Sequence, residues 1–151
     1  MDIWHNYTLV SDMSDKVLVI EGESGFREKL ATALTGIAFD VAGVANYFEA
    51  LWKLGEFKPD LIIMDEELPL SNGWESCYQL RQTFGIPVIL MGRNFEEVVW
   101  EKALEAGADF YLRIPFSALE LAARIKTVLR RYKKNEITHQ ARLSFPPLLG
   151  N

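Results

Sequence analysis

Short apolar runs alternate with segments of helical periodicity along most of this chain, and this alternation constrains the fold more than any other feature. The runs at 16–20, 61–64 and 85–91 are continuous and contain many β-branched residues, which is typical of strands buried on both faces. Weaker runs at 39–44 and 108–113 complete a set of five strands. Helical patterns follow each strand, so the sequence predicts an α/β fold: a doubly wound (βα)5 domain with a parallel five-stranded sheet.

Polar and glycine residues at the ends of these segments predict where the helices begin and end. Ser and Asn side chains cap helix N-termini, and glycine is common just after a C-terminus. The expected caps are Ser24 and Asn46, the capping boxes Asn94–Glu97 and Ser117–Glu120, and the C-terminal glycines Gly36 and Gly107. The last helix is expected to end near its basic residues at 130–134.

The chain has 151 residues, enough for one domain at 15–134, an N-terminal extension at 1–14 and a tail or linker at 135–151. It has one cysteine, no apolar run long enough to span a membrane and no secretory signal, so we expect a cytoplasmic protein without disulfides. The net charge of −5 disfavours nucleic-acid binding by this domain alone.

Carboxylates gather where the predicted strands end. In a parallel sheet, the carboxyl ends of the strands share one edge, and functional crevices lie there. Glu21 and Glu23 follow the first strand, and Asp65, Glu66 and Glu67 follow the third. Like charges at this spacing repel, so a cation, a proton or an arginine is expected among them. For Glu23, Glu66 and Glu67 the alternative is a solvated rim.

Several motifs, taken in order, resemble the receiver domain of two-component response regulators. The segment 59–65 followed by Leu68-Pro69 and Asn72-Gly73 is similar to the phosphoacceptor strand and loop. The segment 107–112 with Pro115-Phe116 is similar to the fifth strand and its cis-proline turn. The resemblance covers about 15–134, is greatest to the OmpR/PhoB-type branch, and implies the CheY-like, flavodoxin-like strand order 2-1-3-4-5.

The resemblance implies aspartyl phosphorylation, in which an Asp carboxylate accepts a phosphoryl group from a histidine kinase beside a divalent metal. Asp65 matches the phosphoacceptor, and Glu21 matches the first of two acidic pocket residues. The backbone carbonyl of Glu67 matches a metal ligand, and Tyr111 matches the switch aromatic.

Three positions depart from the family pattern. Gly22 stands at the second acidic position, Gly92 at the Ser/Thr position and Ile114 at the lysine position. A cation therefore loses a charged oxygen ligand, and we expect no cofactor or weakly bound Mg²⁺. The phosphoryl oxygens lose their lysine, and Tyr111 loses the hydroxyl that normally triggers it.

Two arginines lie near these altered positions. Arg93 follows the Ser/Thr position, and its guanidinium could reach Asp65 or the other carboxylates, or instead lie exposed over the loop. Arg113 precedes the lysine position, but strand alternation points it away from the pocket.

The resemblance also implies a dimer face made by the fourth helix, fifth strand and fifth helix. Asp109, Glu120, Arg124 and Lys126 match its charged positions, whereas Trp100 and Phe110 replace expected charges. Exposed aromatics often mark interfaces, although both rings could also pack into the core. The tail resembles the entry to a winged-helix output domain, which would supply any DNA binding.

Three functions remain open at this stage. The preferred one is an atypical receiver that dimerises and signals through protein contacts with weak or absent phosphorylation, in a regulator of transcription. The second is a conventional receiver phosphorylated on Asp65 by a sensor histidine kinase. The third is a flavodoxin-like binder of a small ligand at residues 22–25. No nucleophile–base pair predicts enzymatic turnover.

Overall fold

The computed structural model describes residues 14–144, and side chains through residue 134. Its main sheet has five parallel strands in the order β2-β1-β3-β6-β7, which confirms the expected order 2-1-3-4-5. These strands are β1 (Lys16–Ile20), β2 (Asp40–Val44), β3 (Leu61–Asp65), β6 (Val88–Gly92) and β7 (Phe110–Arg113).

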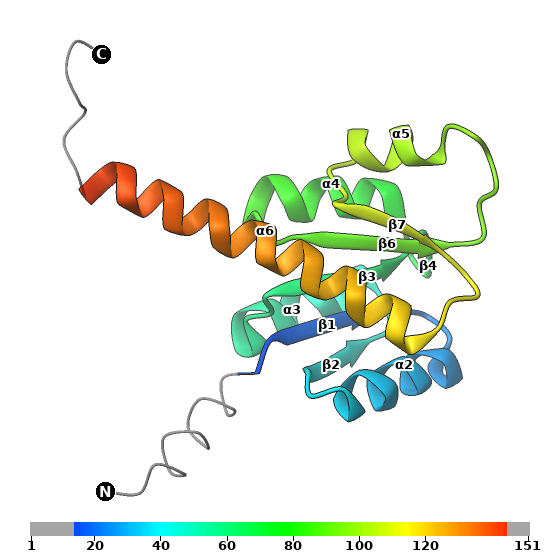
Figure 1. Ribbon diagram of the computed structural model, residues 1–151. Helices are drawn as coiled ribbons and strands as arrows, with labels where there is room; N and C mark the ends of the chain where they lie inside the picture. The colour runs from blue at the N-terminus through cyan, green and yellow to red at the C-terminus, as the bar shows by residue number, and fades with distance from the viewer. Residues whose placement is uncertain (1–13, 145–151) are drawn as a thin grey trace, which may run out of the picture.

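Five helices cover the two faces of this sheet (Figure 1). They are α2 (Ser24–Gly36), α3 (Tyr47–Phe57), α4 (Gly73–Phe84), α5 (Val99–Glu105) and α6 (Ala118–Ser144). Alternate strand residues enter two separate cores. One core packs against α2 and α6, and the other packs against α3, α4 and α5. Burial on both faces explains why these strands are continuously apolar.

The loop expected between the third strand and the third helix contains a small antiparallel hairpin, β4 (Glu67–Leu68) and β5 (Ser71–Asn72). Gly73 closes it, because its amide donates to the carbonyl of Glu66 at 3.1 Å. A Cβ on Gly73 would lie 2.5 Å from the backbone oxygens of both Asp65 and Glu66. Only glycine allows the chain to turn this close to the end of β3.

Helix boundaries agree with the sequence only in part. Asn46 and Ser117 accept amide hydrogen bonds at the starts of α3 and α6, and Gly107 has a φ of 86° after α5, as expected. Ser24 does not cap α2, because the longer Glu23 side chain accepts from the amides of residues 25 and 26.

The expected capping box Asn94–Glu97 is wrong. Asn94 accepts from the amide of Glu96, and α5 begins only at Val99, so residues 93–98 form a longer loop that we call the β6–α5 loop. The last helix also continues ten residues beyond its expected end at 134, to Ser144.

The peptide bond between Ile114 and Pro115 is cis, as the resemblance implied. Within residues 14–144, no helix is both long and apolar enough to cross a membrane. Residues 1–13 of the proposed extension at 1–14, and residues 145–151 of the proposed tail at 135–151, lie outside the described residues.

Candidate functional site

The candidate site lies where the carboxyl ends of β3, β6 and β7 meet, as expected for a doubly wound sheet. A small cavity of about 60 Å³ opens there. It is lined by Asp65, Glu66, Glu67, Gly92, Arg93 and Ile114. The topology therefore brings together most of the pocket residues that the sequence singled out, although they come from three separate segments.

Asp65 ends β3 and is half-buried at the floor of this site. Its Oδ1 accepts a hydrogen bond from the amide of Glu67 at 2.8 Å. The side chain of Glu67 is exposed, which agrees with a place on the solvated rim. Asp65 thus presents a carboxylate to the cavity in the position expected of a phosphoacceptor.

Glu21 is deeply buried beside Asp65, with 5% of its surface exposed. Its Oε1 accepts from the amide of Glu23 at 3.1 Å, whereas its Oε2 has no hydrogen-bond partner. Burial, the neighbouring Asp65 carboxyl group and the charge of Glu23 raise the pKa of Glu21 to about 8. Near neutral pH the Glu21 carboxyl group therefore stays largely protonated.

Gly22 lies against the ring of Pro69. A Cβ on Gly22 would be 2.7 Å from both Cγ and Cδ of that proline, which is closer than side-chain atoms normally approach. An acidic side chain at this position would therefore require the loop after β3 to shift. Pro69 occupies the side of the pocket where the family's second carboxylate stands.

The donor set of this pocket does not fit a resident Mg²⁺ ion. Gly22 supplies no oxygen ligand from a side chain, and the Pro69 ring lies where a side chain at that position would begin. Mg²⁺ prefers charged oxygens in near-octahedral geometry and gives up its water reluctantly. In the part of the chain that the structure describes, no group of three or more His, Cys, Asp or Glu residues is arranged to hold a metal ion.

Ile114, at the lysine position, belongs to the core packed by α2 and α6 and is only 7% exposed. A lysine there would have to withdraw its stem from this core. At the Ser/Thr position, a Cβ on Gly92 would overlap the carboxyl group of Glu66 and the hydroxyl of Tyr111. The space above Gly92 is thus already filled by another pair of side chains.

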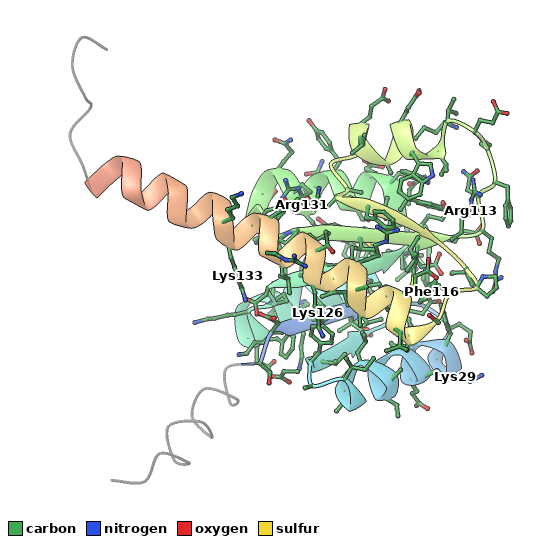
Figure 2. The ribbon with its side chains drawn as sticks, viewed as in Figure 1. Lys29, Arg113, Phe116, Lys126, Arg131 and Lys133 are labelled. Atoms are coloured by element: carbon green, nitrogen blue, oxygen red, sulfur yellow. The ribbon has the colours of Figure 1, made fainter. Side chains whose placement is uncertain are left out.

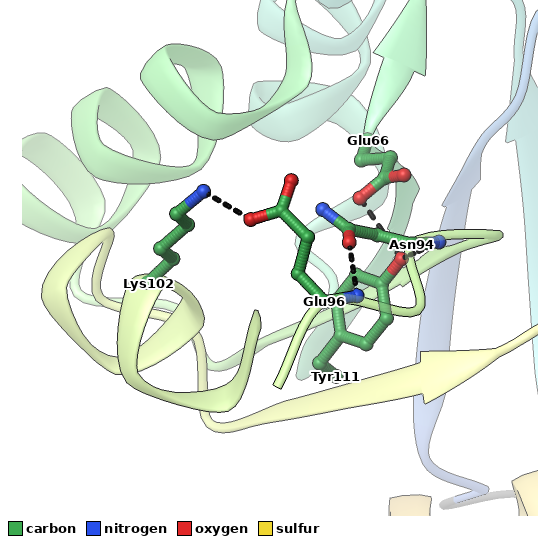
Figure 3. Close-up of polar contacts among 5 residues, drawn as sticks. All are labelled: Glu66, Asn94, Glu96, Lys102 and Tyr111. Carbon is green, nitrogen blue, oxygen red and sulfur yellow. Dashed lines mark hydrogen bonds and ion pairs between the residues drawn. The ribbon is translucent and has the colours of Figure 1, made fainter. Parts of the chain in front are cut away.

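Glu66 and Tyr111 form that pair, across 45 residues of sequence (Figure 3). The Tyr111 hydroxyl donates to Oε2 of Glu66 at 2.9 Å and accepts from the amide of Asn94 at 3.0 Å. Burial raises the pKa of Tyr111, so its hydroxyl stays protonated and can donate. Burial also raises the pKa of Glu66, as do the charges of Asp65 and Glu67, while the bond from Tyr111 and the amide of Arg93 lower it.

The sequence did not identify Glu66 as a functional residue. Its rim alternative is wrong for Glu66, which is half-buried and bonded to Tyr111. Glu23 is exposed and caps α2. One available signal was the combination of an acid directly after Asp65 with a glycine at the Ser/Thr position.

The two arginines take different places. Arg93 borders the cavity but is exposed, and it forms no ion pair with a carboxylate among the described residues. Of the two alternatives for Arg93, the structure shows the exposed one, and the possible ion pair with Asp65 is absent. Arg113 (Figure 2) does not line the cavity, as expected: its guanidinium lies 5.1 Å from the ring centre of Phe95, and its Nε donates to the carbonyl of Asn94 at 3.1 Å.

A cluster of aromatic rings connects Tyr111 to the surface. Its ring stacks on Trp74 with centres 5.9 Å apart, and meets Trp100 edge-on at 6.3 Å. Trp100 in turn packs edge-on against Phe110 at 4.7 Å, and the Arg124 guanidinium lies 4.3 Å from the centre of Phe110. We call the four rings of Trp74, Trp100, Phe110 and Tyr111 the aromatic cluster.

The expected dimer residues lie on α5, β7 and α6, except Asp109, which directly precedes β7. Trp100 is 42% exposed and its neighbour Leu104 is 67% exposed, so this face is partly apolar. Glu120, Arg124 and Lys126 are exposed, and Figure 2 shows Lys126 on α6. The carboxylate of Asp109 is instead engaged within the chain, by the amide of Val88 and the hydroxyl of Tyr132.

Comparisons with known proteins agree with this geometry. A family model described as the response regulator receiver domain matches residues 17–126. The DNA-binding response regulator MtrA of Mycobacterium tuberculosis is 35% identical over 119 residues, covering 79% of this chain and 52% of MtrA. A probable transcriptional regulator, ycf27 of Pyropia yezoensis, is 36% identical over 125 residues, covering 83% and 51%. This chain spans about half the length of these curated relatives.

Solved structures are similar over nearly their whole length. A two-component response regulator from Clostridium difficile superposes with a TM-score of 0.73 at 30% identity, over 79% of this chain and 98% of that one. The BeF3-activated receiver domain of Klebsiella pneumoniae RstA superposes with a TM-score of 0.72 at 26% identity, over 77% and 99%.

Proposed function

The chain belongs to the response regulator receiver domain family, and from this premise we propose that it is an atypical receiver with weak or absent phosphorylation of Asp65. The observation that carries the proposal is that neighbouring groups fill the space at the altered pocket positions. Pro69 crowds Gly22, and Glu66 with Tyr111 crowds Gly92. Ile114 is part of the core. The pocket therefore has no open space at these positions into which another carboxylate, hydroxyl or ammonium group could move to replace the missing ones.

Phosphoryl transfer to a carboxylate depends on positive groups that neutralise the phosphoryl oxygens. No Lys or Arg among the described side chains forms an ion pair with Asp65, although Arg93 borders the same cavity. Glu66 adds a further carboxyl group on the same cavity wall. We infer that Mg²⁺ binds weakly or not at all, and that an incoming phosphoryl anion is repelled.

We further propose that output is exerted through homodimers formed by α5, β7 and α6. The exposed edge of Trp100 with Leu104, and the charged residues Glu120, Arg124 and Lys126 around it, support this face. An apolar centre with a charged rim is the usual composition of an interface. Because Asp109 is engaged internally, we expect it to contribute little to such a dimer.

Transcriptional control is proposed for the regulator to which this receiver belongs. The support is that relatives such as MtrA are named as DNA-binding response regulators, and that the matched region covers only 52% of MtrA. A separate output domain would then bind DNA, and a sensor histidine kinase would be the upstream partner. The receiver itself is proposed to have no independent enzymatic turnover.

A conventional receiver is the second candidate, and one observation favours it. Asp65 is half-buried at the end of β3 and faces the cavity, with one hydrogen bond to Oδ1. The small-ligand alternative has no such support, because the Glu23 carboxylate already accepts from the amides at the start of α2.

The test is the intact mass of the full chain after incubation with acetyl phosphate and Mg²⁺, with Asp65→Asn as the control. We expect no added phosphoryl mass. An added mass that is lost in Asp65→Asn contradicts the proposal and favours the conventional receiver.

The dimer is tested by light scattering after size exclusion, with Trp100→Ala compared with Trp52→Ala. Trp52 lies on α3 and is 87% exposed, so it matches Trp100 in residue type on a different helix. We expect a dimer that Trp100→Ala weakens and Trp52→Ala leaves intact. A monomeric wild-type chain, or equal effects of both substitutions, would rule out this face.

A further inference from the structure

Glu66 lies between the two parts of a receiver that normally communicate only after phosphorylation. It directly follows Asp65, and its carboxylate accepts the hydrogen bond from the hydroxyl of Tyr111. A hydrogen bond to a charged acceptor is stronger than one between neutral groups. The switch aromatic therefore has a fixed acceptor that belongs to the polypeptide itself.

Gly92 is what allows this contact. Any side chain there would collide with Glu66 and Tyr111. The residue type that removes the family's hydroxyl trigger thus creates the space through which Glu66 reaches the ring. Glycine at position 92 thus accounts both for the loss of the family's Ser/Thr hydroxyl and for the hydrogen bond between Tyr111 and Glu66.

The β6–α5 loop is held at the same point from two sides. The amide of Asn94 donates to the hydroxyl of Tyr111 at 3.0 Å, and its carbonyl accepts from Nε of Arg113 at 3.1 Å. Both partners come from β7. The backbone of Asn94 is therefore fastened to β7 without any contribution from Asp65.

The aromatic cluster connects this bond to the outer face. The Tyr111 ring is fully buried, and it supports the edge of Trp100 from below. Trp100 contacts Phe110, which lies under Arg124. An outward rotation of Tyr111 would remove the support of Trp100, so the position of one hydroxyl affects the shape of the α5–β7–α6 face.

We propose that Glu66 is a positioning residue that holds Tyr111 inward and the β6–α5 loop against β7 in the absence of a phosphoryl group. The α5–β7–α6 face is thereby kept in one arrangement without an upstream signal. The inference deepens the proposed function, because it rests on that function for the role of this face. The hydrogen bond to Tyr111 is its direct basis.

The test follows Tyr111 in the unphosphorylated full chain by NMR with ¹³C-labelled tyrosine, the Tyr111 signal being assigned from Tyr111→Phe. The variants are Glu66→Ala, which removes the acceptor, and Glu66→Gln, which keeps an acceptor oxygen without the charge. Glu67→Ala is the matched control, since it removes the same charge from an exposed neighbour. Amide exchange of the loop 93–98 is measured on the same samples.

We expect one buried Tyr111 signal in the wild type and in Glu67→Ala. Glu66→Ala should show a second or exchange-broadened signal, and loop exchange faster by about 10- to 100-fold, as expected for the loss of a hydrogen bond to a charged group. Glu66→Gln should restore most of the inward signal. An unchanged Tyr111 signal and unchanged loop exchange in Glu66→Ala would overturn the inference.

A second variant keeps the test decisive if Glu66→Ala does not fold. Gly92→Ala leaves Glu66 in the chain but places a Cβ between it and Tyr111, so it should release Tyr111 as well. A single inward signal in folded Gly92→Ala then overturns the inference. Because these samples are never phosphorylated, the result is separate from the mass measurement on Asp65: either proposal can fail while the other stands.

Discussion

The carboxylate pocket and the aromatic cluster lie side by side, but they differ in how completely their polar atoms are paired. In the pocket, the buried Glu21 accepts a hydrogen bond at only one of its two oxygens, and Asp65 has no cationic neighbour within 4 Å among the described residues. In the cluster, the only polar atom of Tyr111 outside the backbone both donates and accepts a hydrogen bond. Its ring also contacts two tryptophans.

This difference shows that the two halves of a phosphorylation switch can be separated. The carboxylate pocket, which would bind a phosphoryl group, has few hydrogen-bonding partners and no cationic partner among the described residues. The aromatic cluster, which would respond to phosphorylation, has its polar atom paired and its central ring packed between tryptophans. Glu66 explains how the aromatic cluster can be ordered without a phosphoryl group in the pocket, because its carboxylate accepts the hydrogen bond that holds Tyr111.

Truncation of the central ring should be the most damaging change. Tyr111 has no exposed surface, so Tyr111→Ala should lower the free energy of unfolding by about 3–5 kcal/mol, the usual cost of removing a buried aromatic ring. The bonds to Glu66 and to the amide of Asn94 are lost as well. Urea unfolding measures the effect.

Tyr78→Ala is the matched control for Tyr111→Ala. Tyr78 lies on α4 and is 47% exposed, so its truncation should cost under about 1 kcal/mol. If the two variants lose similar stability, the aromatic cluster is not the well-packed region described above.

The pocket should make folding dependent on pH, through Glu21. Its pKa is raised to about 8 from an ordinary value of 4.5, so between these values the folded state holds a proton that the unfolded state has released. Stability contributed by this group is then present at low pH and is lost as the pH rises towards 8. One pKa unit corresponds to about 1.4 kcal/mol, so the change amounts to a few kcal/mol at most.

The measurement is the free energy of unfolding from pH 5 to 8.5 for the wild type and for Glu21→Gln, which cannot titrate. Subtracting the two curves removes the contribution of other groups. The wild type should lose stability relative to Glu21→Gln as the pH rises. Parallel curves would show that Glu21 is already ionised in the folded state.

The contact between Gly22 and Pro69 should resist any larger residue. Gly22→Ala is expected to cost about 1–3 kcal/mol, the range for overpacking, because its Cβ would press on the proline ring. Gly55→Ala is the matched control: Gly55 lies inside α3 with open space around it, so alanine there should stabilise the protein by about 0.5–1 kcal/mol. Thermal unfolding of both variants checks the prediction, and a Gly22→Ala protein as stable as the wild type would mean that Pro69 moves freely.

The sequence was sufficient to predict the strands, their order in the sheet and the residues at their carboxyl ends. Burial on both faces leaves a continuous apolar run, such as 61–64, that needs no knowledge of distant partners. It was insufficient where a contact spans distant segments. Nothing around Glu66 indicates that its partner is Tyr111, and Gly22 appears only as a missing acid until Pro69 is seen beside it.

Predictions were wrong at the start of α2 and at the end of α6, and each error has a local cause. Glu23 reaches two amides at the start of α2 because its side chain is one carbon longer than a usual capping Asp. The last helix continues beyond its apolar stripe, since neither glycine nor proline occurs between 133 and 144 to end it. An amphipathic pattern marks the part of a helix that packs, and this part can be shorter than the helix.

Loss of Arg113 should have the smallest effect. It tests how much each of two hydrogen bonds contributes to holding the β6–α5 loop, the one from Asn94 to Tyr111 and the one from Arg113 to Asn94. Arg113 is exposed, so the pairing of its guanidinium with Phe95 and its bond to Asn94 should contribute about 0.5–1 kcal/mol. Arg113→Ala should therefore accelerate amide exchange in the loop 93–98 by only a few-fold, and leave the Tyr111 signal inward. Arg93→Ala is the control, since Arg93 is equally exposed and makes no ion pair in the described part of the chain. If Arg113→Ala accelerates exchange in the loop as much as Glu66→Ala does, the loop is held by both β7 residues, Tyr111 and Arg113. The aromatic cluster would then need Arg113 as well as Glu66 to hold the loop in place.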